Sequence, residues 1–178
     1  VLDLKVQHNT QSKDISGVHI TSFHEAVRLG QKIVTNTEEA QYSTSFPCAV
    51  ALVHGDVSPE HIADNALKHP EIQRLSSVLT MDEDEKANAV FPESRLARAD
   101  ITLKNGQILA STWFEPKWDP SAPPTHEELT KKFYDYAKPV LGNSRTKAIY
   151  GAVLGLDSGD THNLFNLLYP SIETGHID

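Results

Sequence analysis

The sequence feature that most constrains the fold is a β-hairpin pattern around residue 105. Ala99, Ile101 and Leu103 alternate with polar residues, which is the period-2 pattern of a half-buried strand. Asn105-Gly106 then predicts a type I′ turn, in which both central residues take positive φ angles. The chain is expected to return over residues 107–114, with one face formed by Ile108, Ala110, Thr112 and Phe114. An antiparallel pair of strands is therefore expected in any fold of this chain.

One further strand is predicted before the hairpin. Residues 14–23 are rich in β-branched side chains and read as a strand. Residues 1–8 are too short to distinguish the end of a helix from a strand. Residues 24–33 lack a clear pattern and are interpreted mainly as a loop, and the acidic stretch within residues 81–89 is interpreted as a solvated loop.

Capping residues and prolines predict where several helices begin. Thr35 to Glu38 fits a capping box, in which the hydroxyl accepts a backbone N–H and the glutamate reaches back. Pro47 predicts a break near Ser45 and a second helix over 47–54, with Gly55 supplying a left-handed residue after its end. Pro59 and Pro70 are expected at the first positions of two short helices.

The carboxy-terminal part of the chain predicts three more helices. Thr125 to Glu128 is another capping box, followed by an apolar stripe that ends at Gly142. The stripe consists of Leu129, Phe133, Tyr136, Ala137 and Val140. Two further helices are expected over 144–156 and 160–169. Strands with helices packed on one side indicate an α+β fold, and the last two helices, with no strand after them, are expected to belong to another part of the protein.

Composition narrows the classes of function. With 178 residues the chain is long enough for one domain with a hydrophobic core. A formal net charge of −8 argues against nucleic-acid binding and against binding to anionic membranes, which need a basic face. No stretch reaches the roughly 20 apolar residues of a membrane span. The single cysteine, Cys48, fits a reducing compartment, so we expect a cytoplasmic location and a buried, structural thiol.

The residues alone show none of the familiar catalytic or cofactor motifs. Nucleotide-binding glycine loops, the H-E-x-x-H metal motif and C-x-x-C are all missing from the sequence. His61 and His69 are not expected to share a metal, and His54 is expected to interact with the carbonyls that end its helix. Trp113 and Trp118 are expected to pack in the core or in a loop. No metal and no cofactor is predicted.

A resemblance to the MmgE/PrpD family enters through motifs that occur in the family's order. They are Thr37 to Ser43, Phe46 to Gly55, His69 to Ile72, the hairpin from Ile101 to Ile108, and the segment from Asp119 to Phe133. The first resembles the family's T-x-x-E-A-x-[FY]-S signature, and the second resembles the helix of small residues that follows it. The resemblance extends over about residues 14–142.

The resemblance implies a domain organisation. Family members combine a largely helical domain with an inserted lid of chorismate-mutase-like α+β fold. By this resemblance residues 14–142 are the lid, residues 1–13 are the end of the helix that enters it, and residues 143–178 are a helical tail that returns to the helical domain. The helical domain itself is expected to be missing here, as are the K-x-[YF]-P and H-x-x-[IL]-D motifs. The complete enzyme is expected to be a homodimer.

The resemblance also implies a reaction class. The family includes 2-methylcitrate dehydratases, cis-aconitate decarboxylases and iminodisuccinate epimerases, lyases and isomerases that remove a proton next to a carboxylate. Their acid and base residues lie mainly outside this chain, so no catalytic residue is assigned and the chain alone is expected to be inactive. Arg28 and His24, in the loop after the first strand, are the candidates for contacting a small carboxylate substrate. The alternative is a stand-alone binding module that reuses the lid fold without chemistry.

Overall fold

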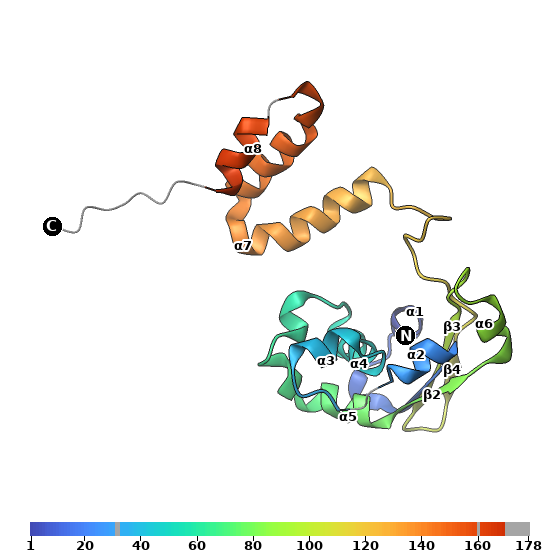
Figure 1. Cartoon of the computed structure of the whole chain (residues 1–178). Helices are drawn as coiled ribbons and strands as arrows, with labels where there is room; N and C mark the ends of the chain where they lie inside the picture. Colours follow the sequence, from blue (N-terminus) through green and yellow to red (C-terminus); the bar gives the residue numbers. More distant parts are fainter. Residues whose placement is uncertain (31–32, 160, 170–178) are drawn as a thin grey trace. The chain divides into compact units, whose positions relative to one another are not determined.

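A computed structural model describes residues 1–30, 33–159 and 161–169 of the chain (Figure 1). The chain divides into two compact units, Val1–Pro116 and Lys117–Asp178, and each is described separately. The α-helices, 3-10 helices (η) and strands of the first unit are α1 (Leu2–Gln7), η1 (Ser12–Asp14), β1 (Ile15–Ser22), α2 (His24–Arg28), α3 (Thr37–Tyr42), α4 (Ser45–His54), η2 (Pro59–Ile62), η3 (Ala66–Lys68), α5 (Pro70–Val78), β2 (Leu79–Glu83), α6 (Glu85–Val90), β3 (Ala97–Leu103) and β4 (Ile108–Ala110). The second unit contains α7 (His126–Leu154), η4 (Leu156–Ser158) and α8 (Thr161–Leu168).

The first unit is built on a four-stranded sheet with strand order β2-β1-β3-β4. β3 pairs antiparallel with β4, as the hairpin pattern predicts, and it also pairs antiparallel with β1. β1 and β2, however, run parallel, with Val18 opposite Leu79. The predicted α+β class and its antiparallel hairpin are therefore confirmed, and the parallel pair involves β2, a strand that the sequence analysis did not predict.

β2 and α6 correct the prediction of a solvated loop within residues 81–89. Leu79 is buried and anchors β2 beside β1, although the following acidic residues hide the strand pattern in the sequence. Asp84 is the N-cap of α6, and its carboxylate accepts a hydrogen bond from the backbone N–H of Ala87 at 3.0 Å. Four acidic residues in a row thus divide between the end of a strand and the start of a helix.

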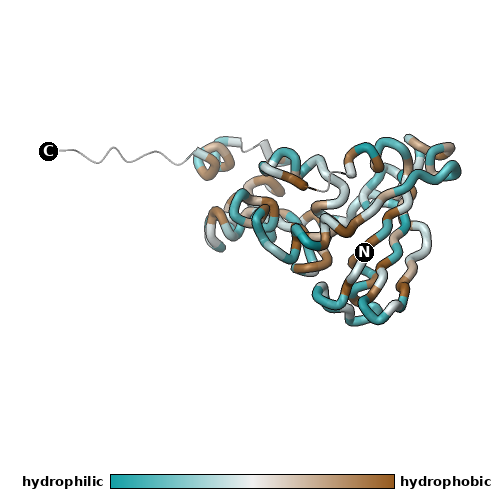
Figure 2. The backbone as a smooth tube through the Cα atoms, turned by 90° about the horizontal axis from the view of Figure 1, so that it is seen from below, coloured by the Kyte–Doolittle hydropathy of each residue, from teal (hydrophilic) through white to brown (hydrophobic). Residues whose placement is uncertain are grey.

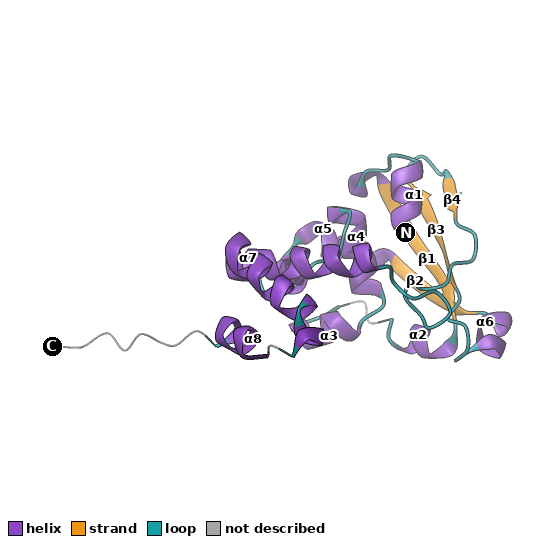
Figure 3. Cartoon of the chain, turned by 90° about the horizontal axis from the view of Figure 1, so that it is seen from above, coloured by secondary structure: helices purple, strands orange, loops and turns teal. Residues whose placement is uncertain are grey.

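One face of the sheet carries the hydrophobic core. Val18, Ile20, Ala99, Ile101 and Leu109 are all buried and share this face. Helices α4 and α5 pack against each other, and α5 also packs against β1 (Figure 3). The side chains that α4 and α5 bury in this core are Phe46, Ala49, Val50, Leu52, Ile72 and Leu75. Burial of each large apolar side chain stabilises the fold by about 1.5–3 kcal/mol.

The boundaries of α4 follow from its sequence. Pro47 is tolerated because it lies in the first turn, where backbone N–H groups have no partner within the helix. Gly55 ends the helix with φ 88°, the left-handed conformation expected from the sequence. The chain breaks between α3 and α4 close to the predicted position, and Pro70 begins α5 as predicted.

Three local predictions need correction. The N-cap of α3 is Asn36, whose side chain accepts from the N–H of Glu39, so the predicted capping box is displaced by one residue from Thr35. Residues 24–28 form helix α2 instead of a loop. The hairpin turn is not type I′, because Gly106 has positive φ and Asn105 does not. The N–H of Gly106 donates to the carbonyl of Leu103 at 2.9 Å, which fits a three-residue loop whose last residue is left-handed.

The return strand of the hairpin faces the core through Leu109. Ile108 is 64% exposed, so the face predicted to contain Ile108 and Ala110 points away from the core. In Figure 2, hydrophobic and hydrophilic residues alternate along the strands, as a sheet with one covered face requires.

The second unit consists of helices with little core of its own. The capping box at Thr125 is confirmed, since its hydroxyl accepts from the N–H of Glu128 and the Glu128 carboxylate accepts from the N–H of Thr125. Gly142 lies at the predicted helix end, where non-helical angles (φ 73°, ψ 164°) produce a kink within α7. α8 lies within the last predicted helix, of which residue 160 falls outside the described residues. Among the described residues of this unit, the buried side chains are Thr146, Ile149 and Ala152.

Candidate functional site at the carboxyl edge of the sheet

The parallel pairing of β1 and β2 brings the segments that follow them to one edge of the sheet. Ser22 lies opposite Glu83 at the carboxyl ends of these strands. Helix α2 follows β1 and helix α6 follows β2, so both begin at this edge. The N–H of Asp84 donates to the carbonyl of Ser22 at 3.0 Å and continues the pairing beyond the strand. Ligands commonly bind beyond the carboxyl ends of strands in α/β sheets.

His24, the first residue of α2, is joined to β2 and α6 by a closed set of hydrogen bonds. Its Nδ1 lies 2.7 Å from Oε1 of Glu83. Its backbone N–H donates to Oδ1 of Asn88 at 2.6 Å, and Nδ2 of Asn88 donates to Oε2 of Glu83 at 3.3 Å. The hydrogen bonds from His24 and then from Asn88 hold the pKa of Glu83 below its ordinary value.

Further contacts hold α2 in place. The rings of Phe23 and Phe91 stack with 4.5 Å between their centroids. At the other end, the hydroxyl of Thr44 donates to the carbonyl of Ala26 at 2.9 Å, and its N–H donates to the carbonyl of Leu29 at 2.9 Å. A short helix that would be marginal alone is therefore fixed by its neighbours.

Helix formation brings the two predicted substrate-contacting residues together. His24 and Arg28 are four residues apart, so they lie one turn apart on the same face of α2. Arg28 is exposed, and its guanidinium has no hydrogen-bond or ion-pair partner within the described part of the chain. Arg28 thus lies on the same face of α2 as the imidazole of His24, and the contact of both residues with a substrate stays a prediction.

Glu83 and Asn88 were missed because their role depends on pairing between segments far apart in the chain. Glu83 lies 59 residues from His24 and Asn88 lies 64 residues from it. In the sequence, Glu83 is only one of four consecutive acids. The alternation of Leu79 and Met81 with Thr80 and Asp82 is the signal that could have revealed the strand.

A second group of titratable side chains lies where α4 ends. His54 stacks on His61, and its ring also meets that of His69 edge-on at 5.6 Å. The expected contact of His54 with the helix carbonyls is wrong, because Lys5 occupies that position: its Nζ donates to the carbonyls of Leu52 and Val53 at 2.6 and 3.2 Å. Among residues 1–30, 33–159 and 161–169, no three His, Cys, Asp or Glu side chains are arranged to hold a metal ion.

The other residues singled out from the sequence have structural surroundings. Cys48 packs against the core, and burial raises the pKa of its thiol, which makes it a poor nucleophile at neutral pH. Arg98 lies over the ring of Trp113, 5.3 Å from its centroid, and Lys132 lies over that of Trp118 at 5.0 Å. Both tryptophans therefore contact cations of the chain itself.

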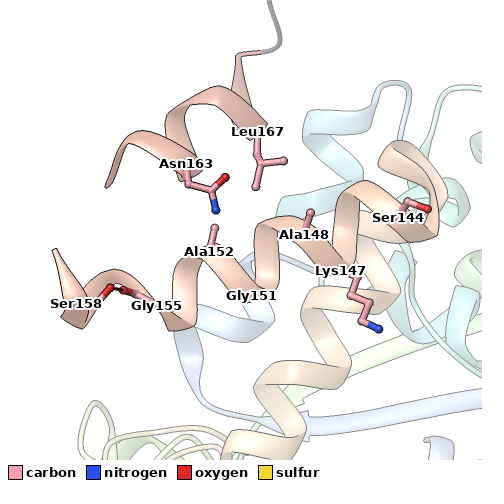
Figure 4. Close-up of a pocket in the computed structure, with 9 residues that line it drawn as sticks. All are labelled: Ser144, Lys147, Ala148, Gly151, Ala152, Gly155, Ser158, Asn163 and Leu167. Atoms are coloured by element: carbon pink, nitrogen blue, oxygen red, sulfur yellow. Dashed lines mark hydrogen bonds between the residues drawn. The ribbon is translucent and has the colours of Figure 1, made fainter. Parts of the chain in front are cut away.

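The second unit contains a groove of about 680 Å³ between α7 and α8 (Figure 4). It is lined by Ser144, Lys147, Ala148, Gly151, Ala152, Gly155, Ser158, Asn163 and Leu167. Asn163 and Leu167 project from α8 towards the small residues of α7 (Figure 4). The side chain of Arg145 donates to the carbonyls of Leu167 and Leu168, which satisfies backbone acceptors at the end of α8. Small residues of this kind permit close packing of helices.

Within the described ranges, none of the helices combines the length and the hydrophobicity needed to cross a membrane. The comparison with curated proteins found no match. A family model, that of the MmgE/PrpD C-terminal domain, matches residues 1–157, which is most of the chain and extends beyond the segment whose motifs carry the resemblance in the sequence. The chain therefore belongs to the MmgE/PrpD family and corresponds to its C-terminal domain.

Proposed function

We propose that this chain is the lid part of an MmgE/PrpD lyase or isomerase that acts on a small di- or tricarboxylate by removing a proton next to a carboxylate. The observation that carries the proposal is the fixed position of α2, with His24 and Arg28 on one face at the carboxyl edge of the sheet. In this assignment residues 14–142 are the lid, residues 1–13 are the end of the entering helix, and residues 143–178 are the returning tail.

Arg28 suits the binding of a carboxylate. A guanidinium carries a permanent positive charge and can donate two parallel hydrogen bonds to one carboxylate group. Because Arg28 has no partner within the described residues, binding a substrate does not require breaking an existing ion pair. A lid that closes over the substrate excludes water and strengthens such interactions.

Exposed hydrophobic side chains of the second unit support the proposal that another domain packs against it. Val140 is 81% exposed and Phe165 is 59% exposed, and Leu129, Leu168 and Tyr169 are also exposed. Hydrophobic residues on α8 are visible in Figure 2. Large hydrophobic side chains that gather on one surface typically mark an interface. We assign their partner to the helical domain of the same enzyme, which as a whole is proposed to be a cytoplasmic homodimer that uses no cofactor.

Turnover assays test this function. The gene region upstream of Val1 is sequenced, and the protein that includes it is compared with the 178-residue chain on 2-methylcitrate, cis-aconitate and iminodisuccinate. We expect turnover of a small carboxylate by the longer protein only, because a positioned base contributes about 10²–10⁴-fold and is assigned to the helical domain. An upstream region without such a domain would instead support a stand-alone module. Turnover by the 178-residue chain alone, abolished by a substitution in that chain, would support an active site within it.

A further inference from the structure

The surroundings of His24 distinguish its two ring nitrogens. Nδ1 lies 2.7 Å from a carboxylate oxygen of Glu83, and an ionised carboxylate can only accept a hydrogen bond. The proton of the neutral imidazole therefore belongs on Nδ1, which leaves the lone pair on Nε2. The His24 side chain is 50% exposed, and its Nε2 has no hydrogen-bond partner within the described residues. Nε2 is thus the atom that a bound molecule can reach.

Glu83 is itself held in place. Its second carboxylate oxygen accepts from Nδ2 of Asn88, and the same amide accepts from the backbone N–H of His24 through Oδ1. Each of the three residues therefore contacts the other two, and they come from β2, α6 and α2. An arrangement of this kind fixes both the direction of the imidazole ring and its tautomer.

We propose that Glu83 is a positioning residue, which keeps the proton of His24 on Nδ1 and presents Nε2 to a bound carboxylic acid as a proton acceptor. When Nε2 takes the proton from the carbon next to a carboxylate of the bound acid, the electron pair of the broken C–H bond stays on that carbon. The imidazolium remains beside the Glu83 carboxylate, and the new N–H can donate to a carboxylate of the bound molecule. The unprotonated and the protonated form of Nε2 are thus both chemically suited to a lid that closes over a carboxylic acid. The role towards a substrate rests on the proposed function, whereas the tautomer of His24 does not.

Nitrogen NMR of the 178-residue chain at pH 7.5 tests the tautomer, because protonated and unprotonated ring nitrogens have well-separated ¹⁵N shifts. His8 and His162 serve as internal controls, since both are exposed and neither side chain has a partner within the described residues. We expect His24 to carry its proton on Nδ1, in contrast to the controls. Glu83→Ala should shift His24 to the tautomer mixture of the controls, whereas Glu83→Gln, which keeps an acceptor oxygen, should retain Nδ1–H in part.

The positioning role of Glu83 would be overturned if wild-type His24 had the same tautomer mixture as His8. It would also be overturned if Glu83→Ala left the tautomer of His24 unchanged. The wild-type comparison needs no variant, so it remains decisive even if a substitution disturbs the fold. In the complete enzyme, Glu83→Ala and His24→Ala should lower kcat/KM by similar factors, and the double variant should be no worse than either. Normal kinetics for His24→Ala together with an Nδ1–H tautomer would reject the site on α2 and leave the positioning of His24 by Glu83 intact.

Discussion

The imidazole rings of His54 and His61 are stacked, with 4.0 Å between their centroids and 4° between their planes. The pair joins the end of α4 to η2, and the ring of His69, just before α5, approaches the ring of His54. Nδ1 of His61 also lies 3.3 Å from Oδ1 of Asp56, so a proton on His61 has a counter-charge. A second proton, on His54, would place two positive rings face to face.

This stack predicts that acid destabilises the first unit. Burial and then the neighbouring His61 and His69 lower the pKa of His54 from its ordinary 6.5. The folded state therefore binds fewer protons at His54 than the unfolded state does. The contribution of neutral His54 to the stability of the first unit is fully present above about pH 6.5, and it is lost as the pH falls through the folded-state pKa. Asp56 acts in the opposite direction, and Lys5 in the same direction as the histidines.

Hydrogen exchange of amides in residues 50–70 at pH 7.5 and pH 5 measures this effect. After correction for the intrinsic, base-catalysed exchange rate at each pH, we expect lower protection factors at pH 5, and His54→Phe should reduce this loss of protection because phenylalanine keeps a flat ring but does not titrate. His8→Phe, at an exposed position, is the control and should leave the loss of protection unchanged. Equal acid sensitivity of His54→Phe and wild type would assign the effect to other groups.

Lys5 is predicted to stabilise the end of α4. Its ammonium donates to two carbonyls of the last turn, at 2.6 and 3.2 Å, where a positive charge also complements the helix dipole. Lys5→Met keeps most of the side-chain volume and should lower the free energy of unfolding of the first unit by about 1 kcal/mol. Lys13→Met, at an exposed site, should change it by less than about 0.5 kcal/mol. Urea denaturation of the two variants decides between this role and a merely solvated lysine.

Leu75 is predicted to be essential for the core between α5 and the sheet. It is fully buried, so Leu75→Ala should lower the free energy of unfolding by about 2–5 kcal/mol through lost burial and the cavity left behind. Val6→Ala is a suitable control, since Val6 is 77% exposed on α1. Thermal denaturation measures both variants, and equal losses of stability would contradict the packing of Leu75 in the core.

Arg28 is predicted to contribute to substrate binding in the complete enzyme. Arg28→Ala should lower kcat/KM by at least about tenfold, which corresponds to about 1.4 kcal/mol. Arg28→Lys should restore only part of it, because an ammonium cannot make the paired hydrogen bonds of a guanidinium. The control is Lys104→Ala, which removes an exposed cation from the hairpin at the opposite end of the sheet. Wild-type kinetics in Arg28→Ala would mean that Arg28 is a solvent-exposed surface residue that does not bind the substrate.

Local interactions made several elements of this fold predictable. The left-handed Gly55, Pro70 at the start of α5, and the capping box of Thr125 and Glu128 each depend on residues within one helical turn of one another. The hairpin partners are also close in sequence, so their alternation and turn residues sufficed to predict the pairing. Even there, backbone geometry decided the turn type, which differs from the prediction at Asn105.

The sequence by itself determined the α+β class, the hairpin and the main helix boundaries, and its ordered motifs indicated the family. Only the tertiary structure decided that β2 exists and that α2 is a helix, and it brought Glu83 to His24 and His61 to His54. These features depend on contacts between distant segments, whose free energy is gained only when the core has formed. A short acidic strand and a five-residue helix have too little intrinsic preference to form alone, so their neighbours in the fold determine their conformation.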